Sequence, residues 1–463
     1  MRASEPGNEP GGSGELDRYP LLEALIKRRS RRFGGGMTMN GGPLAYESGR
    51  TPQSLSPDEE AALAFAGCGV TGPVLAELPF DSGEAHEAGG GNIMINLVGR
   101  TVASGDAVHA VTLFVINDEG AWMLKRPQNY PRSEIPDLVR AAREHRLLEL
   151  YERGRVRIAD GRPEVPRELP FVMPFNKWSA NVPGTTYFLP VNEFTAFYIN
   201  VRLSAFSEEL GYYVVDERNR FSPPGIVRFA RSRGGHLRDD PREGRFATVG
   251  FLETLLYEDA AVEQGEMLQN LALMGEALGV GGFPQFAAHP FIWFQTLGFR
   301  MQDIPFSRTI GAGRVMRRVI RASGKDLPVP TALGLERDGE VLIKPFCPPY
   351  YRNMEEAVLA FVDYKFGEEG TLRDGGTATS WRDGPGIQAG MPRCSDEAIA
   401  ATIAYCEYVH GRYGRFPSNS GPFRTVLAYQ AHHLDPDFYD RFYHQEALTA
   451  AQRQHTASET HGS

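Results

Sequence analysis

Residues 253–284 read ETLLYEDAAVEQGEMLQNLALMGEALGVGGFP, and the rest of the chain is organised around this stretch. Its larger apolar residues recur at spacings of four, three and four, which places them on one face of an α-helix: Met267, Leu271, Met274 and Leu278. Alanine and leucine fill most of the remaining circumference, so we expect this helix to be buried in a core or a subunit interface. It should stop at Gly279, where glycine can adopt the left-handed C-cap conformation.

Composition limits the classes of protein that fit. The 463 residues predict two or three structural units, and 41 % hydrophobic with 23 % charged residues are typical of a soluble globular protein. The net charge of −9 argues against nucleic acid as a partner, because phosphate binding needs a basic face. The most apolar run, residues 111–116, is too short to span a membrane, and the N-terminus lacks the apolar run of a signal peptide. Four widely spaced cysteines indicate reduced thiols in a cytoplasm.

The chain divides by composition into four parts. The Gly-, Pro- and Glu-rich N-terminus and the polar C-terminal tail are expected to be disordered. Between them we expect a main domain with an aromatic-rich insertion that folds over a site or an interface, followed by a helical extension that wraps the core. The expected boundaries are 1–18 for the N-terminus, 19–345 for the domain, about 130–250 for the insertion, 346–449 for the extension and 450–463 for the tail.

Several element ends carry local signals. Ser56 is a good N-cap, with Pro57 at the first helical position and Glu59 completing a capping box. Ser395 is a second N-cap, and Asp435 followed by proline is a third. Residues 118–120, Asp-Glu-Gly, separate two β-rich runs and predict adjacent antiparallel strands.

The first cluster that could carry chemistry is KRRSRRF at residues 27–33. Two or three guanidiniums and a serine hydroxyl, placed at a helix end beside a Gly-rich loop, can hold a phosphate through charge-assisted hydrogen bonds. The alternative interpretation is a solvated basic surface, or cations that stabilise a helix C-terminus.

The second cluster is the glycine-rich stretch after the long helix, residues 279–284. A dinucleotide-binding glycine motif requires strand, glycines and helix in that order, and here the helix comes first. Exposed amides of such a turn could instead contact the edge of a planar ring. The alternative is a buried helix with a glycine stop.

A third cluster is His432-His433-Leu434-Asp435. Imidazoles and carboxylates at close spacing suggest a metal site, and a metal-dependent enzyme using His432, His433 and Asp435 is one functional hypothesis. Neighbouring side chains on one backbone rarely converge on one ion, however, and Asp435 is also explained as a helix N-cap. The sequence therefore assigns no metal ligand.

Two of these motifs resemble those of a known family. RRSRRF, followed by a Ser-capped helix in LSPDEEAALAFAG, resembles the opening of the FMN-dependent nitroreductase family. MLQNLALMGEALGVGG is similar to that family's later helix, which packs at the dimer interface and leads to the flavin ring. The resemblance implies an α+β fold: a nitroreductase-like, antiparallel-rich central sheet flanked by helices, here with an added helical C-terminal region. It also implies a homodimer with FMN bound between subunits.

The resemblance assigns roles to particular residues. The FMN phosphate would be held by Arg28, Arg29 and Ser30, with Arg32 assisting. The ring would lie near Gly281, Gly282 and Phe283, and Asn92 is a weaker candidate for a polar contact. A late basic residue usually completes the phosphate site, and three residues could do so here: Lys344, Arg412 and Arg415.

The expected function is that of an FMN-dependent oxidoreductase that transfers hydride to a small organic substrate, with NAD(P)H as a candidate electron donor. The flavin performs the chemistry, so no catalytic acid, base or nucleophile is assigned. The family's A-P-S-x-x-N-x-Q-P-W segment is replaced here by GCGVTGPVLAELPF. That departure favours an alternative, a flavin-less relative with a binding or structural role.

Overall fold

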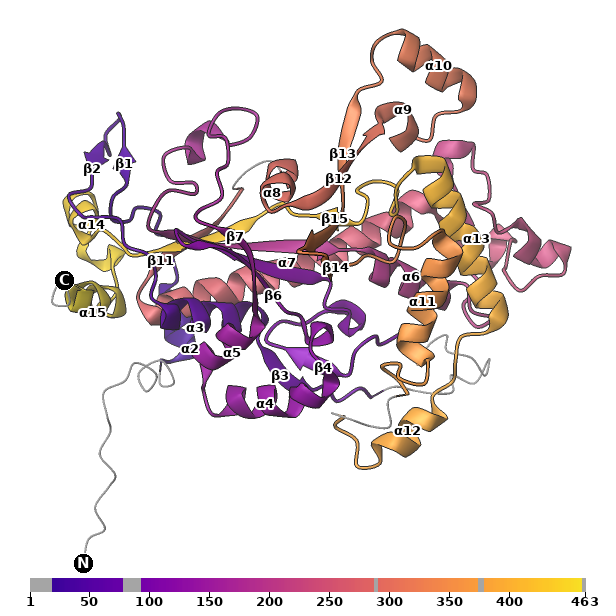
Figure 1. Ribbon diagram of the computed structural model, residues 1–463, viewed down its shortest axis with the longest axis horizontal. Coiled ribbons are helices and arrows are strands. Elements are labelled where there is room, and N and C mark those ends of the chain that lie inside the picture. The colour runs from indigo at the N-terminus through magenta and orange to yellow at the C-terminus, as the bar shows by residue number, and fades with distance from the viewer. Residues whose placement is uncertain (1–18, 78–92, 287–289, 374–378, 460–463) are drawn as a thin grey trace, which may run out of the picture.

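The computed structural model describes residues 19–77, 93–286, 290–373 and 379–459 (Figure 1). The expected disordered N-terminus, residues 1–18, lies outside these ranges. Helices alternate with strands along the described chain, and the main sheet is antiparallel throughout. This is the α+β class that the sequence predicts.

The main sheet has seven strands. Their order is β11-β16-β8-β5-β6-β7, and β15 pairs additionally with β8. The strands are β5 (Val111–Ile116), β6 (Gly120–Leu124), β7 (Arg155–Asp160), β8 (Thr185–Glu193), β11 (Gly281–Gln285), β15 (Phe423–Arg424) and β16 (Ala428–His432). The expected pair around residues 118–120 is confirmed as the β5–β6 hairpin.

Smaller sheets and helices surround it. The minor strands are β1 (Thr38–Met39), β2 (Tyr46–Glu47), β3 (Val70–Pro73), β4 (Val98–Arg100), β9 (Tyr213–Val215), β10 (Phe246–Thr248), β12 (Phe299–Pro305), β13 (Pro328–Arg337) and β14 (Glu340–Ile343). The helices are α2 (Leu21–Lys27), α3 (Pro57–Cys68), α4 (Ile135–Arg143), α5 (Leu147–Gly154), α6 (Thr195–Ala205), α7 (Val249–Leu278), α8 (Pro290–Thr296), α9 (Phe306–Thr309), α10 (Arg314–Ala322), α11 (Met354–Phe366), α12 (Gly384–Gly390), α13 (Asp396–Tyr413), α14 (Pro436–Phe442) and α15 (Ala450–Glu459).

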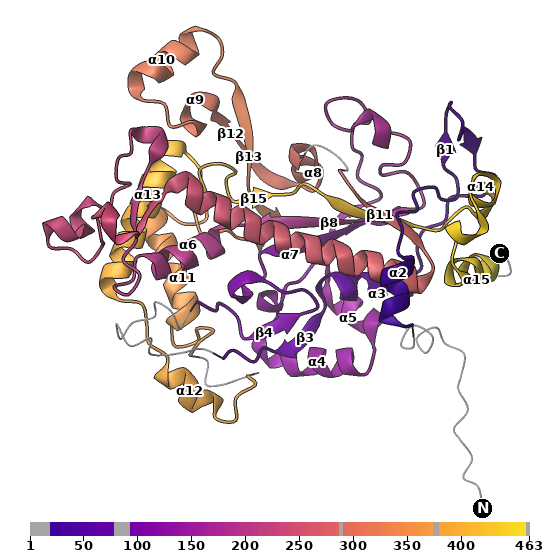
Figure 2. The same ribbon diagram turned by 180° about the vertical axis from the view of Figure 1, so that it is seen from behind.

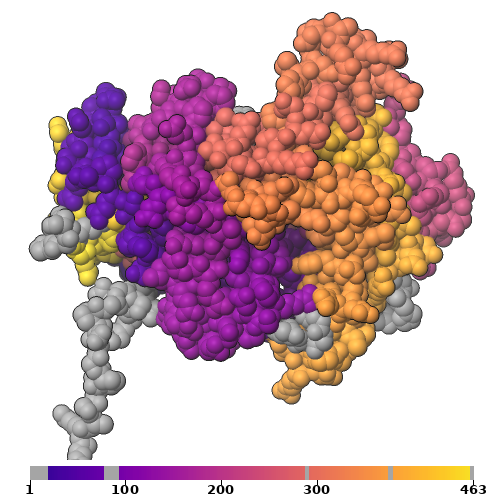
Figure 3. All heavy atoms as spheres, in the orientation of Figure 1, coloured from indigo at the N-terminus to yellow at the C-terminus, as the bar shows by residue number. Residues whose placement is uncertain are grey.

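The two faces of the sheet are covered differently. On one face α3 and α7 pack against β5, β8 and β16 in an apolar cluster, and Figure 2 shows α7 running along this side of the molecule. On the other face α8 and the β12–β13 hairpin pack against β5, β6 and β8. The connection between β12 and β13 contains α9 and α10, which project from the body (Figures 1 and 3).

The long helix of the sequence is α7, thirty residues that follow an N-cap at Thr248 and end at Leu278, with Gly279 as the C-cap. Gly279 has φ +82°, the left-handed conformation expected of a glycine at this position. The sequence predicts a helix that is apolar on nearly every side, and the structure differs from this prediction. Three carboxylates on its buried positions each tie a different segment to it: Glu253, Glu263 and Glu276.

Two of these carboxylates, Glu253 and Glu263, accept hydrogen bonds from backbone amides. Glu253 accepts hydrogen bonds from the amides of Ser418 and Asn419 at 2.7 and 3.0 Å. Glu263 pairs with Arg100 and accepts from the Val111 amide at 3.1 Å. Such bonds satisfy charges that would otherwise destabilise the core. The N-terminal half of α7 also exposes three apolar side chains at helical spacing: Phe251, Leu255 and Val262.

The structure differs from the expected division of the chain. Within residues 130–250, β8 lies inside the main sheet between β5 and β16, so this region is not simply an insertion folded over the domain. Residues 346–449 likewise contribute β15 and β16 to the sheet as well as helices. Long-range strand pairing of this kind leaves no local signal, because each strand is recognisable only by alternation along itself.

The expected disordered tail is corrected for residues 450–459. This segment forms α15, in which Gln452 is buried. Thr449 and Gln452 exchange hydrogen bonds, the Gln452 amide to the Thr449 hydroxyl and the Thr449 amide to the Gln452 side chain. This is a capping box, and it explains why a polar segment begins a helix here.

None of the helices in the described ranges is long and apolar enough to cross a membrane.

Candidate functional site

The basic segment and the glycine stretch are adjacent in space. α2 ends at Lys27 and the chain continues beside β11. The amide of Arg31 donates to the carbonyl of Gly282 over 3.3 Å, and the two residues form an antiparallel bridge. The two motifs that the sequence singles out separately therefore form neighbouring backbone segments.

Three of the expected phosphate ligands lie at the surface. Arg29 and Ser30 are exposed, and Arg28 is half-buried. The Arg29 guanidinium donates to the carbonyls of Ile26 and Arg28 at 2.9 and 2.8 Å, at the C-terminal end of α2. Cations at this end of a helix stabilise it. The alternative role expected for this cluster is therefore present in the structure, and it leaves these side chains accessible to an anion.

Arg31 has a role that the sequence did not indicate. Its guanidinium is buried and pairs with Glu276 of α7 at 2.8 Å. Its Nε donates to the carbonyl of Ala447 at 2.7 Å. Arg31 therefore links the N-terminal segment, the end of α7 and the approach to α15, and its charge is already compensated.

The Arg32 side chain packs against two aromatic rings, unlike the exposed side chains of Arg29 and Ser30. Its guanidinium lies 5.0 Å from the ring centroid of Trp178 and 4.7 Å from that of Phe283. It also donates to the Asn176 side chain at 2.9 Å. Burial lowers the pKa of Arg32. Such cation–π contacts are favourable in a desolvated site, so Arg32 serves the packing around Phe283.

The two later glycines are needed by contacts within the chain. They belong to strand β11, not to an open turn as expected. A Cβ added at Gly282 would overlap the Tyr429 hydroxyl, and one at Gly281 would overlap Leu434. The close approach that the sequence implied is therefore made to neighbouring side chains, and both positions are filled without a ring.

The three late basic residues have partners in other parts of the fold. Lys344 lies 4.2 Å from the Tyr351 ring centroid. Arg412 donates to the Gly311 carbonyl at 2.6 Å, and Arg415 donates to that of Ser418 at 2.7 Å. Asn92 lies outside the described residues.

The residues of the expected metal cluster have different partners. His432 is buried beside Gly34 and Gly281, and its burial lowers its pKa to about 3, so the ring is neutral. Asp435 accepts a hydrogen bond from the Ser48 hydroxyl at 2.5 Å and caps α14. His433 instead contacts Glu59 of α3. Successive side chains of a strand point to opposite faces, which explains the separation of the two histidines.

Sequence reasoning missed the partners of His433. Glu59 was recognised only as part of a capping box, and His455 lay in the expected disordered tail. In the structure Nε2 of His433 lies 3.1 Å from Oε2 of Glu59, and Nε2 of His455 lies 2.5 Å from Oε1. Burial raises the pKa of Glu59, but hydrogen bonds from the two histidines outweigh it and hold the pKa well below its usual range. The capping box at Thr449 is the signal that could have revealed α15.

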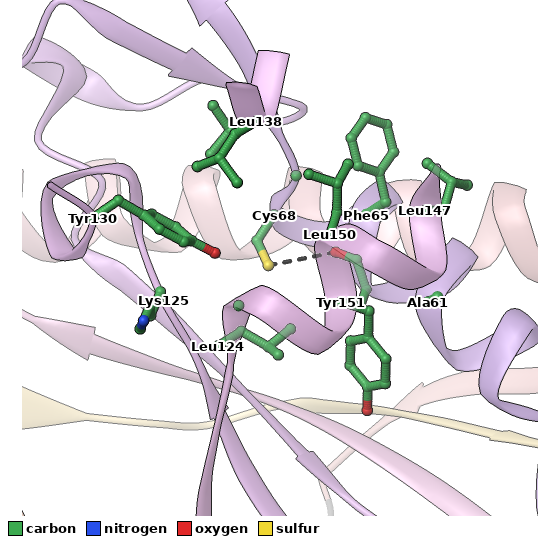
Figure 4. Close-up of a pocket in the computed structure, with 14 residues that line it drawn as sticks. Ala61, Phe65, Cys68, Leu124, Lys125, Tyr130, Leu138, Leu147, Leu150 and Tyr151 are labelled. Atoms are coloured by element: carbon green, nitrogen blue, oxygen red, sulfur yellow. Dashed lines mark hydrogen bonds between the residues drawn. The ribbon is translucent and has the colours of Figure 1, made fainter. Parts of the chain in front are cut away.

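Three cavities among the described residues lie elsewhere. Figure 4 shows an apolar one of about 50 Å³ between α3, α4, α5 and β6, into which Cys68 and Tyr130 point. Burial raises the pKa of Cys68 to about 11, so its sulfur remains a thiol and is a poor nucleophile. A second cavity, of about 530 Å³, is lined by residues 162–167 and Trp293. A third, of about 170 Å³, is lined by Asn96 and Tyr364 among others.

No protein-family model matches the chain, and no curated protein matches it. Among solved structures, the chain is similar to a "putative nitroreductase" from Ralstonia eutropha JMP134, with 13% sequence identity and a TM-score of 0.25 over 64% of this chain and 80% of the other. Similarity at this level carries no inference about cofactor, substrate or activity.

Proposed function

We propose that the chain is an FMN-dependent oxidoreductase that acts as a homodimer on a small organic substrate, with NAD(P)H as a candidate electron donor. One observation carries the proposal. The hydrogen bond from the Arg31 amide to the Gly282 carbonyl places the basic segment and the glycine stretch side by side. These are the two motifs that resemble the nitroreductase family, and they lie far apart in the sequence.

The phosphate end of FMN fits the exposed side chains. Arg28, Arg29 and Ser30 offer two guanidiniums and a hydroxyl, which can bind a phosphate through charge-assisted hydrogen bonds. Their partial or full exposure leaves them accessible to a ligand. Bound FMN would supply hydride transfer, and these residues would bind and orient it.

The ring end fits a single chain less well. Gly281 and Gly282 are covered by Leu434 and Tyr429, and Arg32 packs between Trp178 and Phe283. A ring site would therefore need a second copy of the chain. The exposed apolar row on α7 and the exposed leucines of α2 provide a surface for such a copy.

The same observations favour one alternative. If the glycines and Arg32 serve packing alone, the chain is a flavin-less relative with a binding or structural role. One binding experiment separates the two functions, because only the first requires recognition of the FMN phosphate.

The experiment compares FMN with riboflavin, which lacks the phosphate. The full-length protein is purified, its visible spectrum is recorded, and each ligand is titrated by flavin fluorescence. We expect tighter binding of FMN than of riboflavin, and we expect the R28A/R29A/S30A variant to lose this difference. The R314A/R318A/S323A variant changes the same residue types on and just after α10, at exposed positions, and should bind FMN as the wild type does.

A colourless protein that takes up neither ligand would overturn the proposal and leave the flavin-less alternative. Equal affinity for FMN and riboflavin would show that the phosphate is not recognised, which would remove the assigned roles of Arg28, Arg29 and Ser30.

A further inference from the structure

Glu59, His433 and His455 bring one carboxylate and two imidazoles together from three distant parts of the chain. Glu59 lies in the first turn of α3, His433 directly follows β16, and His455 belongs to α15. One potential ligand atom from each residue lies within 4.8 Å of the other two. We propose that these three side chains bind one divalent transition-metal ion of the zinc type.

The donor set selects the class of ion. Zinc-type ions prefer imidazole nitrogen together with carboxylate oxygen, whereas Ca²⁺ and Mg²⁺ prefer oxygen ligands throughout. Three protein ligands also leave a fourth position for water. Ligands at about 2.0–2.2 Å in a tetrahedron are roughly 3.4 Å apart. The ligand atoms lie within 4.8 Å of one another, so each separation needs to change by about 1.4 Å at most.

The contacts already made point the same way. His433 and His455 direct Nε2 at different oxygens of the same carboxylate, and their ring centroids are 5.1 Å apart. The side chains are largely buried, with 12 % of Glu59, 9 % of His433 and 17 % of His455 exposed. The remaining exposure, greatest at His455, gives an ion a path from solvent.

A metal ion at this site would join three elements of the fold. α15 is the last helix of the described chain, and its Gln452 contacts Glu276 at 3.5 Å. A metal ion shared by His455, His433 and Glu59 would fasten α15 to the first turn of α3 and to the end of β16. Metal binding and docking of α15 would then favour each other, because the three ligands meet only when the helix is docked.

The site does not depend on the proposed flavin function. It uses none of Arg28, Arg29 and Ser30. It also differs from the cluster expected from the sequence, with which it shares only His433.

The test uses the full-length protein after chelator treatment and dialysis, with ZnCl₂ titrated by calorimetry. We expect one equivalent of Zn²⁺ to bind, and E59Q and H455A to weaken its affinity by at least about tenfold. Glutamine at position 59 can keep the capping box with Ser56, so E59Q tests the carboxylate ligand without removing the helix cap. H444A removes an exposed histidine in the same region of the chain and should bind Zn²⁺ as the wild type does.

Thermal unfolding provides a second readout. Zn²⁺ should raise the Tm of the wild type and of H444A by the same amount, and should raise that of H455A by less. The proposal is overturned if Zn²⁺ does not bind the wild type. It is also overturned if E59Q and H455A bind it with unchanged affinity, which would identify the cluster as a pair of hydrogen bonds to Glu59.

Discussion

Arg31 and Glu276 form a buried ion pair, in which Nη1 of Arg31 lies 2.8 Å from Oε2 of Glu276 and the side chains are 4 % and 2 % exposed. The pair joins the basic segment to the end of α7. It also reaches the C-terminal region, since Arg31 donates to the Ala447 carbonyl and Gln452 contacts Glu276. One ion pair thus holds together the two motifs on which the functional proposal rests.

Removing one partner of this pair should be strongly destabilising. We expect E276A to lower the free energy of unfolding by about 3–5 kcal/mol, because it leaves the Arg31 guanidinium buried without its counter-charge. Replacing both residues, in R31L/E276L, should restore much of the loss. The denaturant midpoint measures the effect. The control is E23A, which breaks the exposed Lys27–Glu23 pair and should leave the midpoint unchanged.

Gly282 should be required even when no flavin is present. We expect G282A to destabilise the flavin-free protein by about 1–3 kcal/mol, because its Cβ would overlap the buried Tyr429 hydroxyl. The Y429L background removes that hydroxyl, so the additional effect of G282A there should be smaller. Thermal unfolding of the four proteins checks this double-mutant cycle. An equal effect of G282A in both backgrounds would refute the packing explanation.

Asp106 should make stability depend on pH. It accepts a hydrogen bond from Asn200 at 3.0 Å, and Asn200 in turn accepts one from Lys365 at 2.8 Å. Burial raises the pKa of Asp106 from 3.8 to about 7, partly offset by Asn200 and Lys365. Between about pH 4 and pH 7 the Asp106 carboxyl therefore keeps its proton in the folded protein but loses it in the unfolded chain.

The sign of the effect follows from that difference. As pH rises from about 4 to about 7, the contribution of Asp106 to the free energy of unfolding should fall, by up to about 1.4 kcal/mol per pH unit. D106N should lose this contribution while tolerating the left-handed backbone at φ +53°. The measurement is the free energy of unfolding at pH 5 and pH 8. D338N is the matched control, since Asp338 has the same φ but is exposed, and it should keep the wild-type pH dependence.

The exposed row on α7 should form the contact between subunits. We expect L255E/V262E to convert the homodimer to a monomer, because the two positions lie on one helix face with 45% and 60% of each side chain exposed. Light scattering coupled to size-exclusion chromatography measures the mass. V315E/L327E makes the same changes at exposed positions of α10 and the segment before β13, and should leave the mass unchanged. A wild-type monomer would contradict the expected dimer.

Local signals in the sequence were reliable where both partners lie within one turn. Ser56 and Glu59 form the expected capping box. Ser395 and Asp435 cap their helices as predicted. These interactions join residues two or three positions apart, so the sequence alone contains both partners. α15 has the same kind of signal at Thr449, but the polar composition of the tail concealed it.

The sequence by itself determined where α7 ends, how the capped helices begin and that the strands around residues 118–120 are antiparallel. Only the tertiary structure decided the partners of Arg31, Gly282 and Glu59. A glutamate in the first turn of a helix has the same local pattern whether or not two histidines from other elements reach it. The physical reason is that side chains far apart in sequence meet only through the packing of strands and helices, and periodicity along one element records its buried face but not what it faces.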